Sequence, residues 1–206
     1  MALSGKVGGV YAPSTTAGTD ITAELHDGNG TTAITLDNEY IQPHSESITV
    51  DATAQIRNKD YSINYITAEI TPLGDTGFAT GVDNVSVDYT YYTMEQIGGF
   101  FDWSVDESAE VLETTSFDNS GHKSYVSNLK DWTSSANRYW ASTDTFDEWL
   151  GSFIVVSLYM DKDTGMNRFE GWGIINTKST SVAVDSVVEE SIDIQGSGIL
   201  TYRAGL

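Results

Sequence analysis

Apolar and polar residues alternate along much of the chain, with the two-residue period of a β-strand whose two faces differ. The alternating segments and their expected inward residues are 46–51 with Ile48 and Val50, 61–65 with Tyr61, Ile63 and Tyr65, 84–92 with Val85, Val87, Tyr89 and Tyr91, and 101–105 with Phe101, Trp103 and Val105. A more continuous apolar run, SFIVVSLYM at 152–160, predicts a strand buried on both faces. Two further strands are predicted at 168–175 and 191–202.

Glycines interrupt these last two predicted strands. Gly171, Gly173, Gly196 and Gly198 all lie in otherwise apolar or alternating sequence. A glycine inside a strand is typical of a bulge or of a close approach by another group. We therefore expect bends or tight packing at these positions.

One segment, 142–153, has the pattern of a short amphipathic helix. Thr143 or Asp144 can cap it, and Gly151 can end it. Its expected apolar face consists of Phe146, Trp149 and Leu150. The fold class predicted from the sequence is therefore mainly antiparallel β, as a sandwich or partial barrel, with one short α-helix.

Between these elements, residues 114–144 show weak periodicity together with several large side chains. Compact domains rarely contain so long an irregular loop unless a partner orders it or it has a function. We predict that this segment contacts another copy of the chain. The candidate contact residues are Phe117, Tyr125, Leu129, Trp132, Tyr139 and Trp140.

The composition excludes several classes of function. The 206 residues carry 30 acidic and 10 basic side chains, for a net charge of -20, and such a surface repels nucleic-acid phosphates. Two explanations stay open: a solubility adaptation of the kind found in proteins of high-salt hosts, or a surface along which DNA slides. The chain has no cysteine, which excludes disulfides and thiolate chemistry. No apolar run is long enough for a membrane span, and we expect no signal peptide.

Two acids on one predicted strand face, Asp102 and Asp106, raise the question of a glycosidase, which uses a pair of carboxylates. A glycosidase also needs an apolar pocket that raises the pKa of one of the two acids. The alternation supplies none, so we interpret Asp102, Ser104 and Asp106 as a solvated strand face. We predict no catalytic residue.

Metal and cofactor sites are not predicted. The DKDTG segment at 161–165 begins like a calcium loop, but the position of the bidentate glutamate is occupied by Trp172. A hairpin turn explains the segment, and weak metal binding at Asp161 and Asp163 stays open. The three histidines lie far apart in the sequence. The five tryptophans, all beyond residue 100, are expected in the core or at interfaces, with a carbohydrate-binding surface as the alternative.

The order of several motifs resembles the major tail tube proteins of long-tailed phages and related tailed archaeal viruses. The matching segments are SGKVGGVY at 4–11, the run from IGGFFDWS to DWTSS at 97–135, SFIVVSLYMD at 152–161, and GWGIINTKSTS to QGSGILTY at 171–202. The segment between the first two matches departs from the family, in which the opening strand leads almost directly to the W-S strand. The resemblance thus implies a discontinuous tail tube domain, 1–11 and 95–206, with a small all-β, immunoglobulin-like domain inserted at 12–94.

This resemblance implies a structural role without catalysis. Family members form six-fold rings that stack into a hollow tube, and viral DNA passes through the tube without specific binding. The implied partners are further copies of the chain and the tape-measure, tail terminator and tail tip proteins. The implied location is the virion tail, assembled in the host cytoplasm, with the inserted domain outside the tube and Asp102, Ser104 and Asp106 facing the lumen. The alternative is a carbohydrate-binding adhesin module, and the sequence leaves open whether the tail contracts.

Overall fold

Antiparallel β-sheets form nearly all of the regular structure, as the sequence predicts. The computed structural model describes residues 8–75, 77–116, 118, 120–140, 149–163 and 166–205. The chain divides into two compact units, with boundaries that fall inside strands β1 and β9. Unit 1 comprises Met1–Ala12 and Gln96–Leu206, and unit 2 comprises Pro13–Glu95.

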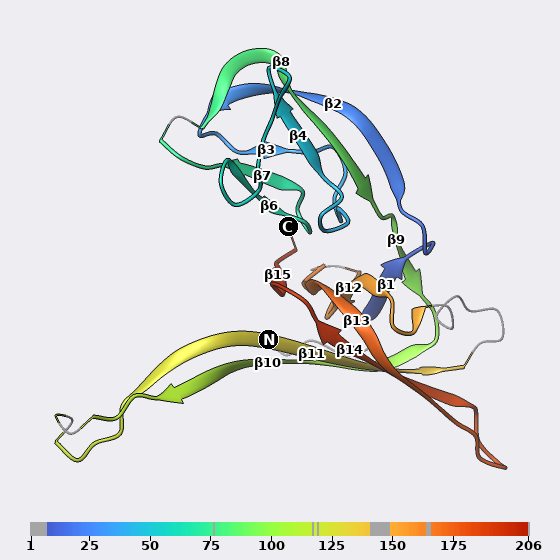
Figure 1. Ribbon diagram of the computed structural model, residues 1–206. Helices are drawn as coiled ribbons and strands as arrows, with labels where there is room; N and C mark the ends of the chain where they lie inside the picture. Colours follow the sequence, from blue (N-terminus) through green and yellow to red (C-terminus); the bar gives the residue numbers. More distant parts are fainter. Residues whose placement is uncertain are drawn as a thin grey trace. The chain divides into compact units, whose positions relative to one another are not determined.

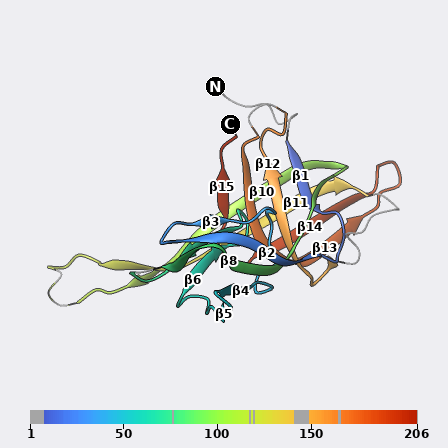
Figure 2. The same cartoon turned by 90° about the horizontal axis from the view of Figure 1, so that it is seen from above.

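Unit 1 is built on one open eight-stranded sheet (Figures 1 and 2). The strand order is β10-β11-β14-β13-β12-β1-β9, and β15 pairs with β13 beside this path. The strands are β1 Gly9–Pro13, β9 Met94–Ile97, β10 Phe100–Glu113, β11 Tyr125–Tyr139, β12 Phe153–Tyr159, β13 Arg168–Ser181, β14 Glu189–Gly196 and β15 Thr201–Arg203.

The core of unit 1 lies inside the curve of this sheet. Val10 of β1, Leu158 of β12 and Ala136 of β11 are buried in one cluster, although β11 is separated from β12 in the sheet by two strands. The sheet must therefore curve to bring its two sides together. The larger neighbouring cluster consists of Ala12, Trp132, Trp149, Ile154, Val156, Ile175, Ile192 and Ile194. The continuously buried strand predicted at 152–160 is confirmed in β12.

A bulge near the start of β10 corrects one predicted side-chain direction. Trp103 and Val105 pack against the core, as predicted. Phe101 was expected beside them, but its side chain is 50% exposed. The register shifts between Phe100 and Asp102, so the extra residue leaves the alternation and Phe100 takes the inward place.

The prediction of an irregular loop at 114–144 is wrong over much of the segment. Residues 125–139 form β11, which pairs with β10 on one side and with β14 on the other. Four inward residues are buried, and of these only Trp132 is a large apolar residue, whereas Ser134, Ala136 and Arg138 are small or charged. An inward face of this kind produces no hydrophobic alternation, so the strand has no signal in the sequence pattern.

The predicted helix at 142–153 falls mostly on residues 141–148, which lie outside the described residues. Of its remaining positions, Trp149 to Gly151 form a turn and Phe153 begins β12. Within the described ranges, no helix has the length and apolar character needed to cross a membrane.

Unit 2 consists of two small sheets that enclose their own core (Figure 1). The first has the order β2-β8-β4-β5, and the second β3-β7-β6. The predicted inward residues Ile48, Val50, Val85, Val87 and Tyr89 are buried in one cluster with Tyr61 and Ile70. The strands are β2 Thr19–Gly30, β3 Ile34–Thr35, β4 Ser47–Val50, β5 Thr53–Ala54, β6 Tyr61–Asn64, β7 Glu69–Pro72 and β8 Phe78–Tyr91.

Candidate interaction surfaces

A polar face extends over four strands of unit 1, on the side of the sheet opposite the core. Residues paired across an antiparallel sheet point to the same face, so the register defines its rows. From β10 through β11 and β14 to β13, the rows are Asp102–Asn137–Ser191–Ser179, Ser104–Ser135–Asp193–Thr177 and Asp106–Thr133–Gln195–Ile174. Every one of these residues is exposed or half-buried. The polar strand face predicted from Asp102, Ser104 and Asp106 is thus one edge of a wider surface.

Within these three rows there is no lysine or arginine. The nearby cations of the same strands point to the core side instead. Arg138 of β11 and Lys178 of β13 both bind Glu190 of β14, and Arg138 and Glu190 are fully buried. Within these rows the charged residues are therefore all acids, whereas Arg138 and Lys178 lie on the core side, where they bind Glu190.

The buried ion pairs around Glu190 have no signal in the sequence, because Arg138 and Glu190 lie 52 residues apart. The Arg138 Nε donates a hydrogen bond of 2.6 Å to Glu190 Oε2, and Lys178 Nζ lies 3.0 Å from Oε1. Burial raises the pKa of Glu190, but hydrogen bonds from Lys178 and Arg138 outweigh it, so the pKa lies below its ordinary value. Glu190 is therefore a carboxylate at neutral pH.

A second buried carboxylate, Glu170 of β13, binds groups on β12, β13 and β15. Ser157 Oγ donates to Glu170 Oε1 at 2.9 Å, and Arg168 Nε donates to the same oxygen at 2.7 Å. Arg203 of β15 reaches Glu170 Oε2 at 3.3 Å. These contacts tie the short strand β15 to β13 and β12. Buried charges that are matched in this way are typical of structural support rather than of a reactive site.

The distal halves of β10 and β11 project from the sheet as a two-stranded ribbon (Figures 1 and 2). Strand β14 pairs with β11 only from Thr133 to Tyr139, so the pairs from Ser108↔Asp131 to Glu113↔Tyr125 have no third strand among the described residues. The ribbon exposes apolar side chains on both faces. They are Val111, Leu112, Tyr125, Val126 and Leu129, which we call the apolar ribbon.

The hairpin that joins β13 to β14 projects from the other end of the sheet (Figures 1 and 2). Its tip exposes Val182, Val184 and Val187. Beside it, the Trp140 amide donates to the Val188 carbonyl at 2.9 Å, and the ring of Tyr139 lies 4.8 Å from that of Phe101. The exposed residues at this end, which we call the aromatic–valine end, are Phe101, Tyr139, Trp140, Val182, Val184 and Val187.

The candidate contact residues predicted from the sequence divide between surface and core. Tyr125 and Leu129 belong to the apolar ribbon, and Tyr139 and Trp140 belong to the aromatic–valine end. Trp132 is 3% exposed and packs in the core of its own unit, so its side chain is not available to a neighbour. Phe117 lies outside the described residues. Phe101 and the valine tip are also exposed, although they lie outside the segment that the sequence singled out.

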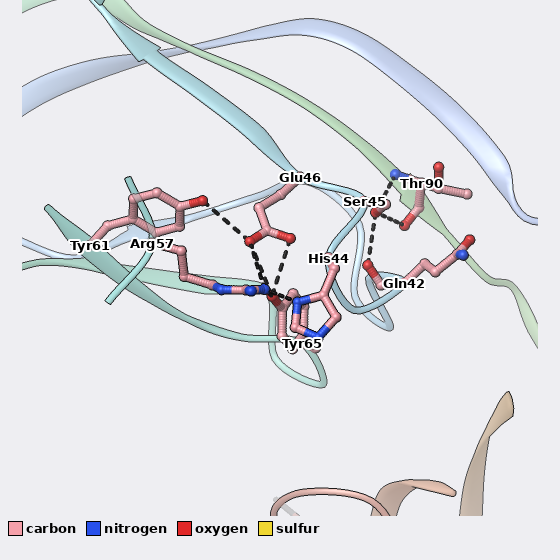
Figure 3. Close-up of polar contacts among 8 residues, drawn as sticks. All are labelled: Gln42, His44, Ser45, Glu46, Arg57, Tyr61, Tyr65 and Thr90. Atoms are coloured by element: carbon pink, nitrogen blue, oxygen red, sulfur yellow. Dashed lines mark hydrogen bonds and ion pairs between the residues drawn. The ribbon is translucent and has the colours of Figure 1, made fainter. Parts of the chain in front are cut away.

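Unit 2 contains a polar cluster that joins the loop before β4 to the residues around β6 (Figure 3). The Glu46 carboxylate is almost fully buried, and it accepts hydrogen bonds from Tyr61 at 3.2 Å and Tyr65 at 3.0 Å. Arg57 lies 3.5 Å from the same carboxylate and also contacts His44. Every group in this cluster has a partner within unit 2, so it is typical of a structural anchor for the loop.

A buried and a half-buried tyrosine should make unit 2 sensitive to alkaline pH. Burial and Glu46 raise the pKa of Tyr65 to about 12, and burial and a hydrogen bond to Glu24 raise the pKa of Tyr89 to about 12. Their contribution to stability is complete below the unfolded pKa of 10.0, and it is lost as the pH rises toward 12 because the unfolded state ionises first. Melting followed by circular dichroism and tyrosinate absorbance should show this loss. It should be smaller in Tyr89→Phe and unchanged in the exposed control Tyr202→Phe.

The candidate catalytic and metal residues do not form a site. Asp102 and Asp106 are both exposed on one strand face. Asp161 is buried, and its Oδ1 accepts the amide of Asp163 at 3.1 Å, as in a turn. Across the parts of the chain that the structure describes, no group of three or more His, Asp or Glu side chains is placed to hold a metal ion.

Comparison with known proteins found likenesses of structure only. No family model and no curated protein sequence matches the chain. A chain from the tail of an empty gene transfer agent particle with C6 symmetry is similar with a TM-score of 0.46 and 14% identity, over 54% of this chain and 87% of that chain. A chain from the virion of a native gene transfer agent particle is similar with a TM-score of 0.45 and 14% identity, over 54% and 89% of the two chains.

Proposed function

We propose that the chain is a structural subunit that assembles with copies of itself into the tube of a viral tail, through which DNA passes. The observation that carries the proposal is the apolar ribbon. Among the described residues no third strand pairs with it, and both of its faces expose large apolar side chains. An isolated two-stranded hairpin is at best marginally stable in water, so a neighbour that covers it would stabilise it.

The open sheet supports assembly in the same way. Strand β10 is an edge strand of 14 residues, and among the described residues no strand pairs with its outer side. In a ring, the edge of one copy joins the sheet of the next. Six copies in a ring and stacked rings are part of the proposal, on the family resemblance described above.

The polar face supports the passage of DNA in such a tube. Apart from the exposed Ile174, its rows consist of Asp102, Asp106 and Asp193 among hydroxyls and amides, and they carry no lysine or arginine. A wall of this kind offers no cations to phosphate groups and repels them at close range, so DNA does not adhere. We place this face toward the lumen and unit 2 on the exterior.

Electron microscopy of the purified protein tests the proposal. We expect rings or hollow tubes at high protein concentration. A chain that stays monomeric under all conditions and is retained by a glycan column would contradict the proposal, and would favour a carbohydrate-binding module.

Labelling of single cysteines tests the placement of the two surfaces, since the chain contains no native cysteine. Ser104→Cys on the polar face should react with a small maleimide both before and after assembly. It should react with a maleimide attached to a large protein only before assembly, because the large reagent cannot enter the lumen. Val82→Cys, at an exposed position of strand β8 in unit 2, is the control, and it should react with both reagents in both states. Large-reagent labelling of Ser104→Cys in intact tubes would place the polar face outside.

A further inference from the structure

We infer that the turn at 42–45 in unit 2 opens in mild acid, because it is held closed by a contact that requires a neutral His44. The inference concerns unit 2 alone and does not depend on the proposed function. It gives the polar cluster of Figure 3 a second property besides anchoring the loop. That property is a response to pH in the range of about 5–8, where imidazole groups change their charge.

His44 occupies an unusual place in this tight turn. The Ser45 amide donates to the Gln42 carbonyl at 3.1 Å, which closes a four-residue turn with Pro43 in second place and His44 in third. The backbone of His44 has a φ of 70°. Proline followed by a positive φ is the pattern of a type II turn, whose third residue is usually glycine or asparagine. A histidine at this position has a backbone cost that other contacts must offset.

The side chain of His44 makes such a contact with Arg57 (Figure 3). Its Nδ1 lies against Arg57 Nη1, and the same Nη1 donates to the Tyr65 hydroxyl at 2.6 Å. A guanidinium group donates hydrogen bonds and cannot accept them, so the lone pair of His44 Nδ1 must be the acceptor. In this contact His44 is therefore neutral, with its proton on Nε2.

A proton on His44 Nδ1 and the hydrogen bond from Arg57 exclude each other. Protonation would place two donors face to face and would bring two cations into contact. In the open turn the ring meets water instead, so the open turn takes up the proton more readily and acid favours it. His44 is exposed, which leaves its ring free to turn away into solvent.

The titratable groups of the segments that form this cluster are already paired with one another. They are Glu46, Arg57, Lys59, Asp60, Tyr61 and Tyr65. Glu46 is the carboxylate that binds Arg57, its side chain is 2% exposed, and it accepts hydrogen bonds from both tyrosines. A protonated His44 would reach Glu46 only by displacing these bonds, so the turn into water is the easier response.

Opening of the turn would also break its bonds to strand β8. The Gln42 amide donates to the Thr90 carbonyl at 2.8 Å, and the Thr90 amide donates to Ser45 Oγ at 3.0 Å. The exchange of these amide protons therefore reports whether the turn is closed. The other histidine of unit 2, His26, has the opposite environment, since its Nε2 lies 2.7 Å from Glu24 Oε1. A proton on His26 strengthens that contact, so His26 supplies a control.

Hydrogen exchange followed by NMR on the unassembled full chain tests the inference at pH 7.5 and pH 5. We expect the protection factors of the Gln42, Ser45 and Thr90 amides, corrected for the intrinsic rate at each pH, to fall about tenfold in acid, as on loss of one hydrogen bond to a charged group. His44→Asn suits the third place of the turn but does not titrate, so its protection factors should be the same at both pH values. His26→Gln should keep the wild-type fall.

Nitrogen NMR of the wild type at pH 7.5 checks the protonation state independently, because Nδ1 of His44 should carry no proton. A proton on Nδ1 at this pH would overturn the inference. Wild-type protection factors that stay constant between the two pH values would overturn it too, as would an equal fall in His44→Asn, since another group would then be responsible.

Discussion

Replacing Glu190 with glutamine should lower the free energy of unfolding of unit 1 by about 3–5 kcal/mol. Glutamine keeps the shape of the side chain but removes its charge. Arg138, which is 1% exposed, and Lys178 would then be cations on the core side of the sheet without their carboxylate. A buried charge that loses its partner retains its full desolvation cost, so the loss is large.

Urea unfolding followed by tryptophan fluorescence measures this loss in unit 1 alone, because all five tryptophans lie beyond residue 100. The matched control is Glu189→Gln on the preceding residue, whose exposed side chain should leave the midpoint unchanged. Replacing the fully buried pair, as Arg138→Met with Glu190→Leu, should recover part of the stability, since the buried guanidinium is removed together with its carboxylate and only the partly exposed Lys178 still loses Glu190. A single variant as stable as the wild type would show that the ion pair contributes nothing.

In acid, the free energy of unfolding of Glu190→Gln should approach that of the wild type. The pKa of Glu190 in the folded chain lies below its ordinary value of 4.5. A carboxylate with a lowered folded pKa stabilises fully above the unfolded pKa, and this stabilisation is lost as the pH falls through the folded pKa. The difference between wild type and Glu190→Gln should therefore be constant above about pH 5 and should narrow below pH 4.5.

The sequence predicts those strands whose inward residues are apolar. In β4 and β8, Ile48, Val50, Val85 and Val87 alternate with polar residues, and burial of one face follows directly from the period. The predicted polar face on β10 also follows from alternation. Its continuation over β11, β14 and β13 does not, because sequence contains no information on which strands become neighbours.

The strand β11 and the bulge at Phe101 show two different reasons for failure. In β11 three of the four buried inward positions hold Ser134, Ala136 and Arg138, so burial there does not follow from apolar character. Arg138 is buried only because a carboxylate from β14 reaches it. At Phe101 one extra residue in β10 reverses the expected face, and a bulge of this kind leaves no mark in the composition of a single strand.

Trp132 corrects one prediction from the sequence and explains another. The sequence placed Trp132 at an interface, and it separately predicted close packing at Gly171 and Gly196. In the structure these are one feature. A Cβ atom on Gly196 would lie 2.3 Å from Trp132 Cε2, and one on Gly171 would lie 2.5 Å from Cζ2. The indole ring therefore lies flat over the backbone of β13 and β14, in space that only glycine leaves free.

Trp132→Ala should then destabilise unit 1 by about 3–5 kcal/mol, through the loss of a large buried ring and the cavity that remains. The indole N–H has no hydrogen-bond acceptor among the described residues, so the loss is one of packing.

Gly196→Ala should cost about 1–3 kcal/mol, because the added methyl group would displace the ring. Gly98→Ala is the control, with no atom within 4 Å of the added Cβ. In the Trp132→Leu background the cost of Gly196→Ala should shrink, since the smaller side chain leaves room for the methyl group. A double-mutant cycle from urea unfolding measures this coupling. Equal costs in the two backgrounds would mean that the glycine is needed for the backbone of β14 itself and not for the tryptophan above it.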